Sequence, residues 1–126
     1  MTTSQKIGWG LSGLFGLFML GASVAPKLTG MAVAQETMAA LGWPDAPLLL
    51  IGGLELVSTV LFLIPATGVL GAVLMMAILG GAIATNLHGN APLASHTLFG
   101  IYLGIWMWVG LVLRDPRVGT VFPVAR

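Results

Sequence analysis

Long apolar segments constrain the fold of this chain of 126 residues more than any other feature. A helix that crosses a hydrocarbon core about 30 Å thick needs about 20 mostly apolar residues. Four segments approach that length, at residues 7–25, 46–64, 68–86 and 97–113. They take up most of the chain, so residues 1–126 are expected to form one domain with no separate soluble part. The sequence therefore predicts an all-α integral membrane protein that folds as a four-helix transmembrane bundle.

The connections between these segments carry further information. Residues 31–41 contain no Gly or Pro, which favours a short amphipathic helix in the first outer segment. One stripe of such a helix would carry Met31, Ala34, Met38 and Leu41. Only residues 65–67 separate the second span from the third, so these two spans are expected to be antiparallel neighbours.

Pro26 predicts where the first span ends. A proline ring clashes with the preceding turn of a helix and disfavours helical geometry in the residue before it, so the helix should stop at Ala25. Lys27 would then lie at the water interface. This placement leaves no cation within the depth of the bilayer.

The distribution of basic residues predicts the orientation. Lys6 precedes the first span, and Arg114, Arg117 and Arg126 follow the last one, whereas the opposite side carries only Lys27. Because cytoplasmic loops carry an excess of Lys and Arg, both termini are expected to be cytoplasmic.

Glu55 is the one charged residue between Ala46 and Ile64. It lies nine residues from either end, or roughly 13 Å, which is close to the bilayer midplane. An acidic side chain there costs about 2.5 to 3.5 kcal/mol, so it should face protein or a polar cavity. Tyr102 and Trp106 are expected at the same depth, with Ser12 one turn away. Two hypotheses follow: Glu55 binds a ligand head group or exchanges protons, or it is a structural acid bonded to a facing helix.

Three polar residues flank the loop between the third and fourth spans. Asn86, His88 and His96 are expected to form the mouth of a cavity that reaches down to Glu55. His96 has an alternative role as a cap at the start of the fourth span. Two histidines are too few for a zinc site, which normally has three or four protein ligands, so no metal is expected.

Charge and cysteine content exclude several classes of function. The net charge of +1, with no run of Lys or Arg, argues against nucleic acid as a partner. With no cysteine the chain has no thiol relay and no thiolate ligands for a cluster. Redox chemistry would therefore need a bound cofactor or another subunit.

Several short strings resemble the DoxX-like family. They are GGLEL at 52–56, IPATG at 64–68, GGAIATNLH at 80–88, HTLFG at 96–100 and LRDPR at 113–117. The resemblance implies a small bacterial protein of the inner membrane with four helices. Members similar to the namesake are linked to a quinone-reducing thiosulfate oxidoreductase, others to oxidant-resistance complexes, and distant animal relatives to receptor assembly. Where the family pattern would be Thr-His-Leu-Arg, this chain has TNLH at 85–88, so a role that needs that basic pair is in doubt.

Together these observations give one preferred hypothesis. The protein would be a membrane subunit that binds a quinone-like or other amphiphilic molecule and serves a redox or stress-response pathway. The expected ligand-binding residues are Glu55, Tyr102, Trp106, Asn86, His88 and His96. The resemblance implies an oxidoreductase-associated subunit with a quinone as the candidate cofactor, and it leaves open whether the chain is itself an enzyme.

The main alternative is a scaffold or assembly factor without ligand chemistry of its own. Its glycine-lined faces would bind membrane or redox protein partners, or a second copy of the chain. A proton-coupled carrier is disfavoured, because only one charge is expected inside the bilayer and the chain shows no inverted repeat.

Overall fold

The computed structural model describes all 126 residues, and the chain is all-α. Its first long helix, Thr3–Leu28, consists of α1 (Thr3–Phe18), a π-helical segment (Met19–Val24) and α2 (Ala25–Leu28). The other helices are α3 (Ala32–Ala40), α4 (Leu48–Leu63), α5 (Gly68–His88) and α6 (Phe99–Arg114). Shorter turns of helix occur at Pro65–Thr67, Leu93–Thr97 and Val118–Thr120.

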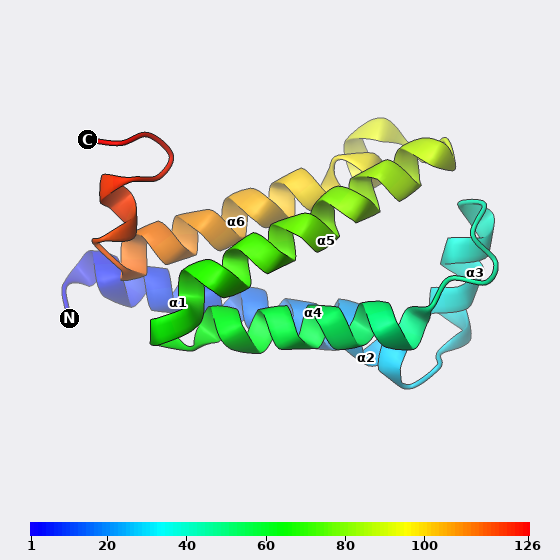
Figure 1. Cartoon of the computed structure of the whole chain (residues 1–126), viewed down its shortest axis with the longest axis horizontal. Helices are drawn as coiled ribbons and strands as arrows, with labels where there is room; N and C mark the ends of the chain where they lie inside the picture. The colour runs from blue at the N-terminus through cyan, green and yellow to red at the C-terminus, as the bar shows by residue number, and fades with distance from the viewer.

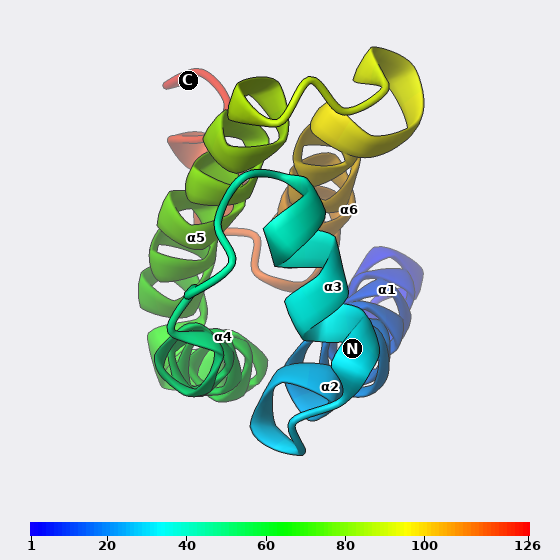
Figure 2. The same ribbon diagram turned by 90° about the vertical axis from the view of Figure 1, so that its right-hand side faces the viewer.

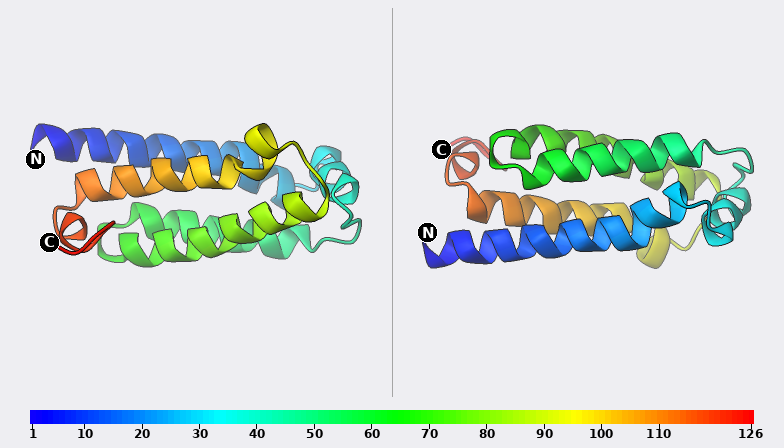
Figure 3. Two further views of the ribbon diagram at one scale, coloured as in Figure 1. Left: turned by 90° about the horizontal axis from the view of Figure 1, so that it is seen from above. Right: turned by 90° about the horizontal axis from the view of Figure 1, so that it is seen from below.

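The long helices run side by side along one axis (Figure 1). The first long helix packs against α6 and α4, and α5 packs against α4 and α6, so that the four form a closed ring. Both termini lie at one end of this bundle, and α3 lies across the other end (Figures 1 and 2). The views from above and below show the same lengthwise alignment (Figure 3). The predicted neighbour relation of the second and third spans is confirmed as the α4–α5 pair.

The length and apolar character of the helices indicate a membrane protein, but α4 is shorter than the other long helices. Three helical stretches are long and apolar enough to cross a bilayer: Thr3–Leu28, Pro65–His88 and Leu93–Arg114. Helix α4 has 16 residues, or about 24 Å at 1.5 Å per residue, which is shorter than a typical hydrocarbon core. Proline at position 47 delays its start, so the helix begins at Leu48 rather than Ala46.

Apolar side chains fill the centre of the bundle. Phe15, Phe62, Met75 and Met107 are fully buried there and come from four different helices. The outward faces of the same helices are also apolar, as expected for surfaces in contact with lipid. Examples are Leu17, Val57, Val73 and Ile105.

The predicted end of the first span at Ala25 is wrong. The helix continues through Pro26 to Leu28 because the segment before it widens to π geometry, in which the Ala25 N–H bonds to the Leu20 carbonyl. Pro26 then occupies the first turn of α2, where its missing N–H does the least harm. As a result Lys27 remains on the first long helix and turns into the bundle.

Other boundaries shift by smaller amounts. Helix α5 extends to His88, and the expected loop before the fourth span contains the π-helical turn Leu93–Thr97. The short outer helix is present as α3, and it is joined to its neighbours by Gly30 and Gly42, both with positive φ. Of its expected inner stripe, Ala34, Met38 and Leu41 are half-buried and Met31 is exposed.

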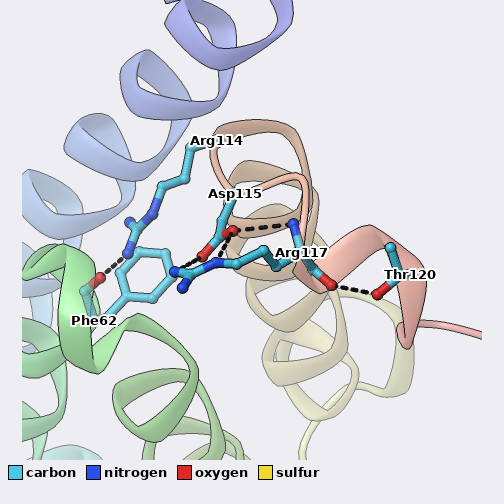
Figure 4. Close-up of polar contacts among 5 residues, drawn as sticks. All are labelled: Phe62, Arg114, Asp115, Arg117 and Thr120. Carbon is cyan, nitrogen blue, oxygen red and sulfur yellow. Dashed lines mark hydrogen bonds and ion pairs between the residues drawn. The ribbon is translucent and has the colours of Figure 1, made fainter.

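At the end of the bundle that holds both termini, Arg114 of α6 contacts both α1 and α4. Its guanidinium lies 4.3 Å from the ring centroid of Trp9 and 4.4 Å from that of Phe62. It also donates a hydrogen bond to the Phe62 carbonyl (Figure 4). Arg114 is only 5% exposed.

Just beyond α6, Asp115 accepts hydrogen bonds from the backbone and side chain of Arg117 (Figure 4). Mainly because of the side-chain bond from Arg117, the pKa of Asp115 lies below its ordinary value of 3.8. A carboxyl group whose pKa is lower in the folded protein than in the unfolded chain stabilises the fold at every pH above its pKa in the unfolded chain. That contribution is lost as the pH falls through the lower pKa of the folded protein.

We therefore expect an NMR titration in detergent micelles to give Asp115 a pKa below 3.8, and R117A to raise it towards that value. The variant R126A removes a cation that makes no hydrogen bond with Asp115 and serves as the control. An unchanged Asp115 pKa in R117A would contradict the assigned cause.

Glycine permits the close crossing of α4 and α5. A Cβ atom on Gly71 would overlap the backbone of Phe62, whereas one on Gly80 of the same helix would meet nothing within 4 Å. Backbone atoms cannot move aside as flexible side chains do, so Gly71 must stay without a side chain.

We expect G71A to lower the free energy of unfolding by about 1 to 3 kcal/mol, as overpacking of a tight contact does. The matched variant G80A should leave the stability unchanged or raise it by up to about 1 kcal/mol, because alanine favours helix. Denaturant titration of both proteins in micelles measures the difference, and equal stabilities would refute the close approach.

Candidate functional site

A cavity of about 470 Å³ lies in the half of the bundle nearest α3. Its walls come from the first long helix, α3, α4, α5 and α6, and most of the residues that line it are hydrophobic. Met38 and Leu41, with Trp43 beyond them, form the wall at the α3 end, where Figure 2 shows α3 lying across the bundle. This volume is within the range of sites that hold small molecules.

Glu55 lies inside this cavity and is 4% exposed. Its Oε1 is 2.9 Å from the Lys27 Nζ, and its Oε2 accepts a hydrogen bond of 2.5 Å from the Ser23 hydroxyl. Lys27 in turn donates to the Ser23 Oγ at 2.9 Å and to the Ser23 carbonyl at 3.2 Å. Both carboxylate oxygens are therefore held by the first long helix.

The prediction that no cation lies within reach of Glu55 is wrong. That prediction assumed that the first span ends before Pro26. The helix instead continues through Lys27, and the side chain of Lys27 reaches Glu55. Lys27 and Ser23 are four residues apart and so share a helix face. A Cβ on Gly52 would lie 2.9 Å from the Lys27 Cβ, so this glycine allows the lysine to approach α4. The spacing of Ser23 and Lys27, with a glycine three residues before Glu55, was the signal available in the sequence.

The structure brings together three of the six residues predicted to bind a ligand. Glu55, Asn86 and His96 all line the cavity. His96 is exposed and pairs through its Nδ1 with the Ser95 hydroxyl at 2.7 Å. The Asn86 amide donates to the Ala82 carbonyl of its own helix. That any of these residues binds a ligand stays a prediction.

Tyr102, Trp106 and His88 lie elsewhere. Tyr102 is 46% exposed, and its hydroxyl bonds to the Ala94 carbonyl. The Trp106 indole N–H bonds to the Leu11 carbonyl at 3.0 Å on the first long helix. His88 lines an adjoining hollow beside Gly42, which shares Trp43 and Thr85 with the cavity. An estimate of depth from residue number does not say which way a side chain points around the helix axis.

Ser12 also does not reach Glu55. It is fully buried against Gly110 of α6, and its hydroxyl makes no hydrogen bond within the chain. The histidine and acidic side chains form no group of three or more that could hold a metal ion.

A helical bundle with apolar outer faces and a cavity that holds an ion pair among mostly hydrophobic walls is the architecture of a small membrane protein. The sequence model of the DoxX-like family matches residues 10–110, which contain Ser23, Lys27, Glu55 and every residue predicted to bind a ligand. The chain therefore belongs to the DoxX-like family, as its short strings suggested. Comparison with curated proteins and with solved structures gives no match.

Removing one partner of the Lys27–Glu55 pair should destabilise the protein. K27M leaves the buried carboxylate without its cation, which for buried pairs costs about 3 to 5 kcal/mol. E55Q should cost less, because the side chain of Lys27 is 18% exposed and remains closer to water. The double variant K27M/E55Q should be more stable than the sum of the single changes implies.

A double-mutant cycle on unfolding free energies in micelles measures this coupling. K6M serves as the control, since Lys6 is exposed near the N-terminus. Additive effects of K27M and E55Q would show that the two side chains do not interact in the folded protein.

Proposed function

We propose that this protein is a bacterial inner-membrane protein that binds an amphiphilic, quinone-like molecule and serves as a subunit in a redox or stress-response pathway. The observation that carries the proposal is the cavity of about 470 Å³ that holds Glu55 and Lys27 among mostly hydrophobic walls. Apolar walls with a few convergent polar groups suit a molecule with a hydrocarbon body and a polar head.

We further propose that α4 is a fourth span. It packs between the first long helix and α5, and both termini lie at one end of the bundle, as an even number of crossings requires (Figure 1). Its short length would be met by local thinning of the bilayer. Lys6, Arg117 and Arg126 all belong to the end with the termini, which supports a cytoplasmic location for that end.

The absence of cysteine bears on the pathway. The chain offers no thiol to accept electrons, so its contribution to a redox reaction would be to hold the amphiphile while a partner protein or cofactor exchanges electrons with it. The exposed His96 and the half-buried Asn86 would lie near the polar end of such a molecule.

A scaffold role is the second candidate. Gly10 and Gly13 leave open space on the outer side of α1, where a helix of a partner or of a second copy would approach closely. In that case the Lys27–Glu55 pair is a structural bond, complete within this chain.

Filling the cavity separates the two candidates. Ala82 and Ala77 are both exposed positions of α5, but only Ala82 lines the cavity, so A82F adds an aromatic ring to the cavity wall and A77F is its matched control. We expect native mass spectrometry with a short-chain quinol, the hydroxyl-bearing reduced form of a quinone, to detect binding to the wild type and to A77F, and A82F to weaken it at least about tenfold.

If neither the quinol nor any co-purified amphiphile is retained by the wild type, the binding proposal is overturned and the scaffold role stands. Binding that survives unchanged in A82F would place the ligand outside this cavity.

A further inference from the structure

In the cluster of Lys27, Ser23 and Glu55, every side-chain donor already makes a hydrogen bond, and only acceptor positions remain free. Lys27 has three N–H donors, and its three bonds go to the Glu55 Oε1, the Ser23 Oγ and the Ser23 carbonyl. The single donor of the Ser23 hydroxyl is used on the Glu55 Oε2. A carboxylate has about four acceptor positions, of which these contacts use two.

The same cluster carries no net charge. Of the residues that line the cavity, only Lys27 and Glu55 carry permanent charges, and they are 2.9 Å apart. A carboxylate head group would be attracted by Lys27 and repelled by Glu55, and an ammonium head group would meet the reverse. Either would lose its hydration in an apolar cavity without a matching gain in attraction.

We propose that the Lys27–Ser23–Glu55 cluster selects neutral amphiphiles whose head group donates a hydrogen bond, such as a phenol or alcohol. The free acceptor positions of Glu55, whose carboxylate is paired with Lys27 at 2.9 Å, receive the ligand's O–H, and hydrogen bonds to a charged acceptor are stronger than those to a neutral one. This inference rests on the proposed binding function and names the class of ligand.

Two probes of nearly the same shape test the donor requirement. 4-Octylphenol donates a hydrogen bond, and its methyl ether, 4-octylanisole, has the donor removed. We expect the wild-type protein in nanodiscs to bind the phenol about tenfold or more tightly, since a hydrogen bond to a charged group contributes that much. Competition measured by native mass spectrometry gives the ratio of the two dissociation constants.

Single variants test the role of charge. E55Q frees Lys27 donors and leaves one cation, so the phenol-to-anisole ratio should fall at least about threefold and octanoate should gain about tenfold. K27M leaves the acid and should instead favour octylamine. T85V, which removes a hydroxyl that lines the cavity but bonds to its own helix, should keep the wild-type ratio.

The outcomes separate the inference from the function on which it rests. Equal binding of phenol and anisole by the wild type overturns the donor requirement while amphiphile binding stands, and this comparison does not depend on any variant folding. Octanoate or octylamine bound as tightly as the phenol by the wild type overturns the selection for neutral heads. Failure of all four probes to bind overturns the proposed function itself.

Discussion

The ion pair between Lys27 and Glu55, bridged by Ser23, is the interaction on which the rest of this bundle depends. It joins the first long helix to α4 by side-chain bonds, and it makes a buried carboxylate acceptable in an apolar environment. It also places polar side chains in the lining of a cavity whose other walls are mostly hydrophobic. The same few atoms therefore account for a structural contact and for the chemical character of the candidate site.

The two ends of the bundle are built differently. Near the termini, Gly8 and Gly71 bring helix backbones into contact, and Arg114 fills the remaining space against two aromatic rings. Near α3, the cavity lies between the helices and is lined mostly by hydrophobic residues. The tightly packed end supplies a rigid frame, and the other end keeps the space that a ligand would need.

Much of the fold could be predicted from the sequence, because apolar length and turn residues are local signals. They identified the apolar helices, the outer helix α3 and the burial of Glu55. The candidate site was predicted only in part. Asn86 and His96 line the same cavity as Glu55, but Tyr102 does not, because an expected depth along the helix does not fix the direction in which a side chain points. Lys27 was missed because a π-helical segment let the helix pass a proline that normally ends one.

The pairing of Lys27 with Glu55 also bears on the order in which the chain enters the membrane. The lysine is synthesised before the glutamate, so the cation is already on the first long helix when α4 emerges. Inserted alone, α4 would carry an unpaired acid, at a cost of about 2.5 to 3.5 kcal/mol. As the proposed fourth span, α4 inserted beside the first helix would form these bonds on entry, and the short turn Pro65–Thr67 would bring α5 in as the other arm of a hairpin. In that order of insertion the first helix would be the surface against which the rest of the protein packs.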